Sequence, residues 1–565
     1  MVKVEGIVAD AARVVGAFLL CAAGIGCGGG GGGTGSGPGS STRGPGMGDP
    51  PAPSVTLQGG SATAAGGQGK TGGAAHLVSS GAITIGPDFQ PPAASPPGNA
   101  MAVAASDLSS DVQAPGSVSI SGTQSSGGTD AVRTITAGGD IFISGTLRGA
   151  DLGGARQGLA LKASGTVYVT GSIDTSGADG SGQGGGPVTI MAQQVIVSGK
   201  LLTHGGDGSS TGGDGGSVTI DSSGTVAVTG TFDMRGGSAT GGSAATGGAA
   251  GALKVGETTR PSAIGLTVPL VTKGGDGQAS GGDGGTVALE AHGGDLRVSG
   301  VVDASGGDSA TKPGAGGAVN GNPGPEGSSA GIDIAGQVAS NGGSITKGGA
   351  GNGASGGIIK LVVLAPDGKG TIEPTGQVQA DGGSSAGAGT AGGGGLIYLF
   401  TNHADVSIHG KMLARGGADN DPGGTGGGGG FVYVFTGNFH DRMSGILIVE
   451  TDGVIDTSGG DGTVGGSARN DGKAGSVALF PVKQDDEYDV EQVAVLINSD
   501  GVHGSDRGWI DNRGQIFARG GKVNGNGGDV IFHGKRQDGN ETPIPDNVVD
   551  SSGDGTGKSG DFAGE

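Results

Sequence analysis

Apolar and polar residues alternate with a period of two in short stretches along most of the chain, and Gly-rich spacers separate these stretches. In the clearest example, residues 184–237, an alternating stretch, a turn, a second alternating stretch and a Gly/Ser/Asp spacer occur twice in succession. Val188 and Ile190 of the first copy correspond to Val218 and Ile220 of the second. A period of two predicts strands with one buried face. Strands this short cannot bury a core alone, so we expect successive units to stack on one another.

The repeats continue far beyond these two copies. A phrase of the form φ-x-φ-[ST]-G-x-φ, where φ is apolar, recurs from Val118 onward, and Gly-Gly pairs close the repeats from the copy at Val195 onward. These pairs begin at residues 205, 236, 274, 306, 342, 382, 416 and 459, at a mean spacing of about 36 residues, which is typical of a solenoid. Each repeat reads as strand, turn, strand, Gly turn, strand and Gly-rich loop.

We therefore expect an all-β fold, a right-handed parallel β-helix (solenoid) with long Gly-rich loops, over residues 55–535. Antiparallel hairpin repeats or propeller blades are the alternative, because a two-residue Ser-Gly or Thr-Gly link also closes a hairpin.

Stacked coils would place apolar residues of successive repeats in inward rows. One predicted row contains Val188, Val218, Val287 and Ile359, and the other contains Val197, Val228, Val298 and Ile408. Polar residues at the Gly-Gly corners, such as Asp303, Asp456 and Thr203, would also lie in rows. We expect the corner glycines to supply positive φ angles.

Composition narrows the class of protein. Glycine accounts for 139 of 565 residues without a Gly-X-Y period, which excludes collagen. Aromatic residues make up only 3%, fewer than the core of a globular enzyme of this length usually needs. The net charge is −21, and no basic stripe is present, so nucleic acid is not an expected partner.

The first residues have the pattern of a secretion signal. Residues 14–25 are an apolar run of the length of a signal core, and the run ends in Ala-Gly-Ile-Gly before Cys27. This sequence resembles a bacterial lipobox, which implies cleavage before Cys27 and attachment of lipid to its thiol. We expect residues 1–26 to be a lipoprotein signal peptide and residues 27–54 to be the lipidated Cys with a flexible Gly/Ser/Pro tether. The resemblance implies a membrane partner and a location in the bacterial cell envelope, at the outer membrane or cell surface.

The repeat pattern resembles the parallel β-helices of bacterial autotransporter passengers and filamentous haemagglutinins. With the lipobox, this resemblance implies a Gly-rich, non-enzymatic cell-surface lipoprotein that acts as a structural spacer, an adhesin or an envelope-matrix component. A surface polysaccharide or another cell-surface protein would be its partner. The alternative is a carbohydrate-binding or polysaccharide-cleaving β-helix protein.

The repeat pattern changes near the C-terminus. Residues 481–499 contain no glycine and carry the one dense acidic cluster, and we expect an irregular cap near residues 480–515. That cluster consists of Asp485, Asp486, Glu487 and Asp489, whose consecutive positions favour a solvated loop over two carboxylates that face each other across a cleft. Residues 536–565 are predicted to be a polar C-terminal tail.

The paired GGDG sequences raise the question of calcium. They resemble calcium-binding nonapeptide repeats, but Ser217 and Thr286 stand where that pattern needs Asp, so only looser binding by oxygen ligands remains open. The weak candidates are Asp207, Asp214, Asp276 and Asp283. The eight histidines show no metal-ligand spacing, and no catalytic residue or other cofactor is predicted.

Overall fold

Short parallel strands in three sheets form the framework of the protein in the computed structural model. The structure describes residues 55–56, 68–91, 98–104, 108–241, 244–323, 329–346, 351–365, 367–386, 389–401, 404–419, 424–436, 446–462, 493–498, 509–521, 525–533, 549–552 and 562–564. The all-β parallel β-helix is confirmed, because neighbouring strands pair in parallel along each sheet. Antiparallel hairpins and propeller blades are thereby excluded.

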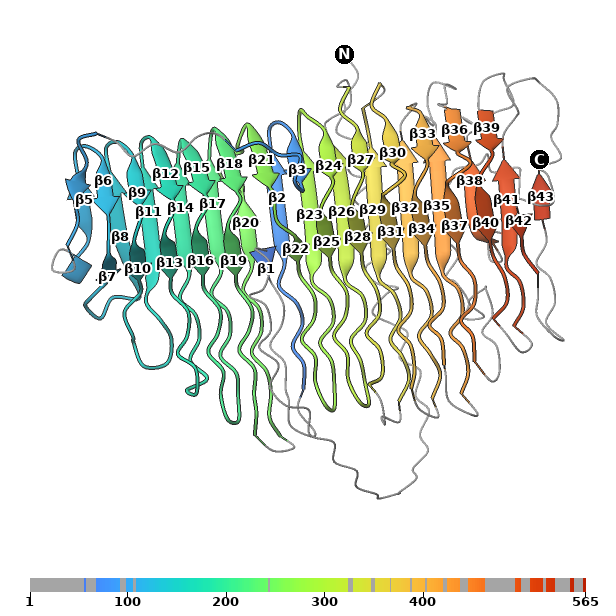
Figure 1. Ribbon diagram of the computed structural model, residues 1–565, viewed down its shortest axis with the longest axis horizontal. Coiled ribbons are helices and arrows are strands. Elements are labelled where there is room, and N and C mark those ends of the chain that lie inside the picture. The colour runs from blue at the N-terminus through green and yellow to red at the C-terminus, as the bar shows by residue number, and fades with distance from the viewer. Residues whose placement is uncertain are drawn as a thin grey trace, which may run out of the picture.

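The three sheets extend along the whole stack (Figure 1). The first sheet has 15 strands, in the spatial order β43 (Phe562–Gly564), β41 (Asp529–His533), β38 (Val493–Asn498), β35 (Phe431–Thr436), β32 (Leu396–Thr401), β29 (Ile358–Val363), β26 (Ala318–Pro323), β23 (Thr286–Ala291), β2 (Ala75–Ser79), β20 (Leu253–Val255), β17 (Val218–Ser222), β14 (Val188–Ala192), β11 (Gly158–Ala163), β8 (Val132–Ala137) and β5 (Val112–Ala114). The second has 14, in the order β39 (Trp509–Asn512), β36 (Ile446–Val449), β33 (Val406–Ile408), β30 (Gly370–Ile372), β27 (Ile332–Ile334), β24 (Leu296–Val298), β3 (Ile83–Ile85), β21 (Ala263–Leu266), β18 (Thr225–Val228), β15 (Gln194–Val197), β12 (Thr166–Val169), β9 (Ile141–Ile143), β6 (Val118–Ile120) and β4 (Met101–Ala102). The third also has 14, in the order β42 (Val549–Asp550), β40 (Gln515–Phe517), β37 (Val454–Asp456), β34 (Lys411–Leu413), β31 (Gln377–Gln379), β28 (Gln337–Ala339), β25 (Val301–Asp303), β22 (Leu270–Val271), β1 (Val55–Thr56), β19 (Thr231–Asp233), β16 (Lys200–Leu202), β13 (Ser172–Asp174), β10 (Thr146–Arg148) and β7 (Thr123–Ser125).

One coil passes through a strand of each sheet and returns through a long loop. Thus β14, β15 and β16 form one coil, and β17, β18 and β19 form the next. The predicted unit of three strands and one Gly-rich loop is therefore confirmed. In Figure 1 the long loops project together from one edge of the stack.

Both predicted inward rows are confirmed, and all eight side chains are at most 1% exposed. In the first row Val188 pairs with Val218, and Val287 leads through Val319 to Ile359. In the second row Val197 pairs with Val228, and Val298 leads through two further isoleucines to Ile408.

Among the described strands, the order in the stack differs from the order along the chain at one place. The N-terminal strands β1, β2 and β3 lie in the middle of the three sheets instead of at an end (Figure 1). Strand β2 pairs with β20 on one side and with β23 on the other. Strand β3 lies in the same way between β21 and β24, and β1 lies between β19 and β22. We call the described residues 55–56 and 68–86 the N-terminal coil. The later chain leaves a space one strand wide for this coil in each sheet.

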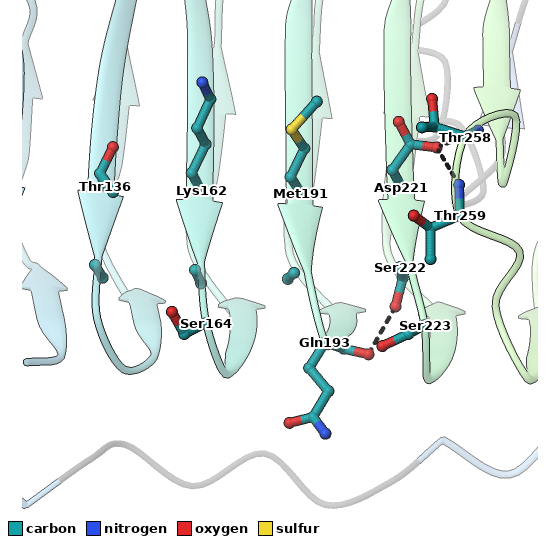
Figure 2. Close-up of a pocket in the computed structure, with 13 residues that line it drawn as sticks. Thr136, Lys162, Ser164, Met191, Gln193, Asp221, Ser222, Ser223, Thr258 and Thr259 are labelled. Carbon is teal, nitrogen blue, oxygen red and sulfur yellow. Dashed lines mark hydrogen bonds between the residues drawn. The ribbon is translucent and has the colours of Figure 1, made fainter.

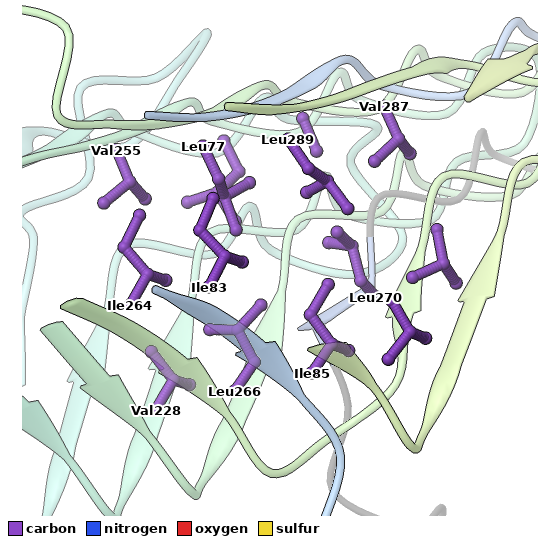
Figure 3. Close-up of a cluster of buried hydrophobic side chains, with 14 of the residues drawn as sticks. Leu77, Ile83, Ile85, Val228, Val255, Ile264, Leu266, Leu270, Val287 and Leu289 are labelled. Atoms are coloured by element: carbon purple, nitrogen blue, oxygen red, sulfur yellow. The ribbon is translucent and has the colours of Figure 1, made fainter. Parts of the chain in front are cut away.

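The N-terminal coil completes both the hydrogen bonds and the core of its neighbours. Ile264 donates its amide to the carbonyl of Ala82 at 3.0 Å, and Ile83 donates its amide to the carbonyl of Asp295 at 2.9 Å. Side chains of the coil also fill the inward rows: Leu77, Ile83 and Ile85 are fully buried between residues of the preceding and following coils (Figure 3).

Glycines of the long loops allow backbones to approach closely. The amide of Gly213 donates to the carbonyl of Gly206 across one loop at 2.9 Å, and the amide of Gly237 donates to Gly213 from the next loop at 2.8 Å. A Cβ atom at Gly206 or Gly213 would overlap a backbone carbonyl of the preceding coil. The same alternation of bonds within and between loops continues through Gly275, Gly282, Gly307, Gly314 and Gly343.

Positive φ angles, the expected reason for the glycine enrichment, account for only a minority of the glycines. Among the described residues, positive φ is found at seven glycines, such as Gly256 with φ +79°. Most loop glycines instead serve backbone-to-backbone contact, which no other residue permits at these distances.

The corner residues cap turns instead of forming uniform polar rows. Thr203 is fully buried and donates its hydroxyl to the carbonyl of Gly216 at 2.6 Å. Asp303 and Asp456 accept the amides of Ser305 and Ser458 at 2.9 and 3.0 Å. Within its row, Asp303 has the apolar neighbours Val271 and Ala339.

The C-terminal region belongs to the stack where the structure describes it. Strand β38, inside the segment expected to be an irregular cap, pairs with β35 on one side and β41 on the other. Strands β42 and β43, within the expected polar tail, pair with β40 and β41. At the opposite end, the buried Arg133 donates to the carbonyl of Gly127 at 2.7 Å and pairs with Asp111 at 3.3 Å.

A charge in an inward row should destabilise the protein strongly. We expect Val228→Asp to lower the free energy of unfolding by about 2–5 kcal/mol, because the carboxylate would have no partner in an apolar core. Thr229→Asp, at the adjacent half-buried corner, should cost less than about 0.5 kcal/mol. Urea unfolding with limited proteolysis measures both; equal tolerance of the two variants would mean that the alternation does not mark the buried face.

Close packing of glycines should hold the N-terminal coil in place. A Cβ atom at Gly282 would overlap the carbonyl oxygen of Lys70, so Gly282→Ala should cost about 1–3 kcal/mol. Amide exchange in residues 68–72 should rise at the same time. Gly116→Ala is the control, because nothing lies within 4 Å of a Cβ atom there. Equal amide protection of residues 68–72 in both variants would contradict the contact.

Candidate functional site

A groove on the outer face of the first sheet has a cavity volume of about 600 Å³. A row of four lining residues crosses the neighbouring strands β8, β11, β14 and β17, with one residue at the equivalent position of each strand. That row consists of Thr136, Lys162, Met191 and Asp221, whose side chains leave the sheet on the same side (Figure 2). The other lining residues are Ala137, Ala163, Ser164, Ala192, Gln193, Ser222, Ser223, Thr258 and Thr259.

Asp221 builds one wall of the groove. Its side chain is 7% exposed, and its Oδ1 accepts the amides of Thr258 at 3.0 Å and Thr259 at 3.5 Å. Ser222 donates its hydroxyl to the carbonyl of Gln193 at 2.9 Å, which joins two coils along the rim. These bonds fix the hydroxyl groups and backbone of the wall relative to the strands.

The lining suits a polar ligand. Hydroxyl groups, one amide, the exposed Lys162 and the 41% exposed Met191 offer donors, acceptors, one positive charge and one apolar contact. Glycoside hydrolysis generally uses two carboxylates. This lining contains one, Asp221, whose Oδ1 already accepts backbone amides. The groove is therefore equipped for binding more than for acid–base chemistry.

The four calcium candidates each bridge two coils of the loop region. Each accepts a backbone amide of the following coil, Ser238 to Asp207 and Ala249 to Asp214 at 2.7 Å, and Asp308 to Asp276 and Ala315 to Asp283 at 2.8 Å. Asp276 also pairs with Lys273 at 3.5 Å. Within the described part of the chain, no group of three or more His, Cys, Asp or Glu residues is placed to hold a metal ion. Calcium binding by these residues stays a prediction.

Aromatic rings gather on the outer face of β32 and β35. Phe400 stacks on Phe435 with ring centroids 5.5 Å apart, and Tyr433 lies beside them. The three side chains are 8%, 4% and 3% exposed, and burial raises the pKa of Tyr433 to about 12. Tyr398 stacks on Phe400 and Phe431 stacks on Tyr433, with ring centroids 6.3 and 6.1 Å apart, and these two outer rings are partly exposed.

The remaining predicted residues lie outside the described residues. They are Cys27 and the acidic cluster Asp485, Asp486, Glu487 and Asp489. Sequence reasoning did not identify the groove. Its only signal was that Lys162, Met191 and Asp221 occupy outward positions of their strands, and their alignment depends on the register between coils.

No family model, curated protein or solved structure matches the chain. Across the described residues, no helix is long and apolar enough to cross a membrane.

Proposed function

We propose that the protein is a lipid-anchored element of the bacterial cell envelope, a rod that lies along the surface as part of an envelope matrix. The place where the chain joins the rod is the observation that carries this proposal. Strand β1 starts at Val55 and is ninth of the 14 strands in the third sheet. Anything attached to the chain before β1 therefore reaches the rod near its middle.

The length of the rod and the reach of its tether favour a rod that lies parallel to the membrane. With about 4.8 Å between strands, the third sheet is on the order of 60 Å long. The Gly/Ser/Pro segment from Cys27 to residue 54 would have a root-mean-square reach of roughly 30 Å. A rod held at its middle by such a tether has two free ends near the membrane. This attachment favours a matrix element or adhesin over a spacer that stands upright on one end.

The charge and surface suit this role. A net charge of −21 keeps such rods hydrated and resists their nonspecific association. The proposal requires no chemical reaction, and the groove supplies a place where a polar surface polymer can bind.

The second candidate function is binding of an acidic surface polysaccharide in the groove. The row of Thr136, Lys162, Met191 and Asp221 supports it, because hydroxyl-rich linings with one cation can match the hydroxyl and carboxylate groups of such a polymer. Lys162 is the residue that would select an acidic sugar over a neutral one.

The anchor is tested by replacing its cysteine. Cys27→Ser should release the protein from the membrane fraction or leave the precursor uncleaved, because the thiol that accepts the lipid is lost. Cys21→Ser, inside the signal core, is the matched control and should remain membrane-bound. Fractionation and mass spectrometry of the N-terminus measure both. Unchanged membrane attachment of the Cys27→Ser variant would remove the lipoprotein proposal.

The groove is tested with polysaccharides of known charge. Lys162→Ala should weaken binding of polygalacturonate roughly two- to fivefold, the value of one exposed ion pair, and leave binding of a neutral glucan unchanged. Lys200→Ala is the control, because Lys200 is exposed on the third sheet, outside the groove. Affinity electrophoresis measures all three proteins. Equal binding by the Lys162 and Lys200 variants would exclude the groove as the site.

A further inference from the structure

The N-terminal coil fills a space one strand wide between strands of the later chain, and we call this space the slot. Strands β19, β20 and β21 form one side of this slot, and β22, β23 and β24 form the other. Without the N-terminal coil, the facing backbone edges of all three sheets would lack strand partners at this level. Such edges bind an added strand through main-chain hydrogen bonds, and pockets for alternate side chains give specificity.

Apolar side chains of the N-terminal coil hold it in the slot. Ala75 and Leu77 enter the first sheet between Leu253 and Val255 on one side and the strand of Val287 on the other. Ile83 and Ile85 enter the second sheet in the same way.

Polar side chains add to these contacts. The imidazole of His76 lies 3.4 Å from the carboxylate of Glu290 and 3.6 Å from that of Glu257. The same contacts would form with an identical coil from another chain.

A single linking segment joins the coil to the rest of its own chain. This strap, residues 87–100, connects the N-terminal coil to the start of β4, which is seven strand steps away from β3 in the second sheet. At its start, Asp88 pairs with Arg297 at 3.0 Å, and the ring of Phe89 occupies the space where a Cβ atom of Gly265 would lie.

The reach of the strap decides which slot the coil can occupy. Seven strand steps correspond to about 34 Å, and the 16 residue steps from Ile85 to Met101 reach at most about 58 Å. The strap therefore spans the distance within one chain and gives the coil a high effective concentration at its own slot. A strap that cannot span the distance removes this advantage and leaves the slot open to another chain.

We propose that the slot accepts the N-terminal coil of a second copy of this chain, so that copies can be joined by coil exchange. Copies crowded at one surface would then be connected through their cores, without a separate contact surface. Exchange of an identical element needs no new complementarity, since the contacts are those already made within one chain.

A shortened strap provides the test. Deleting residues 91–98 leaves eight residue steps to Met101, at most about 29 Å, so the coil cannot reach its own slot while β4 stays paired with β6. The deletion retains Asp88 and Phe89 and every residue of the coil. Two shortened chains are prepared with Cys21→Ser and Cys27→Ser, one with His76→Cys and one with Lys254→Cys. These positions are Cα partners on the outer face of the first sheet, so a disulfide fits them.

We expect the mixed shortened chains to form dimers or larger species by light scattering, with disulfides between residue 76 of one chain and residue 254 of another. Thr189→Cys, three strand steps from His76, replaces Lys254→Cys as the control and should give no cross-link. A folded monomer whose N-terminal coil is cut by protease would overturn the proposal. Association without the 76–254 disulfide would overturn it equally.

If the shortened chain does not fold, the proposal is tested with the same cysteine pair in chains that keep the complete strap. Refolded together at high concentration, these chains should give cross-linked pairs that are lost when one chain carries Thr189→Cys in place of Lys254→Cys. Absence of the 76–254 disulfide between chains would overturn the proposal in this arrangement too.

Discussion

Backbone hydrogen bonding between coils one strand spacing apart is the constraint on which this structure depends. Strands of two to six residues bury too little surface to be stable alone, so each needs a partner above and below. The inward rows of Val, Ile and Leu follow from that stacking, because equivalent positions of successive coils must share one face. The N-terminal coil satisfies the same constraint at the single level where the later chain leaves a gap.

The composition of the chain follows from the same constraint in the loops. Two limbs of each long loop bond to one another and to the loops of neighbouring coils, as Gly206, Gly213 and Gly237 show. At this distance a Cβ atom would overlap a carbonyl oxygen. Glycine is therefore a packing residue here, as valine is in the sheets. Because few bulky side chains are needed in either region, an aromatic content of 3% is compatible with a continuous core.

Much of this architecture could be predicted from the alternation and the Gly-Gly spacing. The alternation identifies Val188 and Val218 as inward residues of equivalent strands, and the structure agrees. It does not identify Ala75 as the neighbour of Leu253, because every coil offers the next one a similar apolar face. Chain order was the natural assumption, and the N-terminal coil does not follow it. The groove was missed for a related reason, since Lys162 and Asp221 come together only through inter-coil register.

The position of the N-terminal coil is tested most directly by disulfides within one chain. In chains with Cys21→Ser and Cys27→Ser, we expect the pairs His76→Cys with Lys254→Cys and His76→Cys with Ala288→Cys to form disulfides, since each joins Cα partners. Lys254→Cys with Ala288→Cys should not, because two strand spacings, about 9.6 Å, separate them. A disulfide between residues 254 and 288, without those to residue 76, would show that the coils stack in chain order.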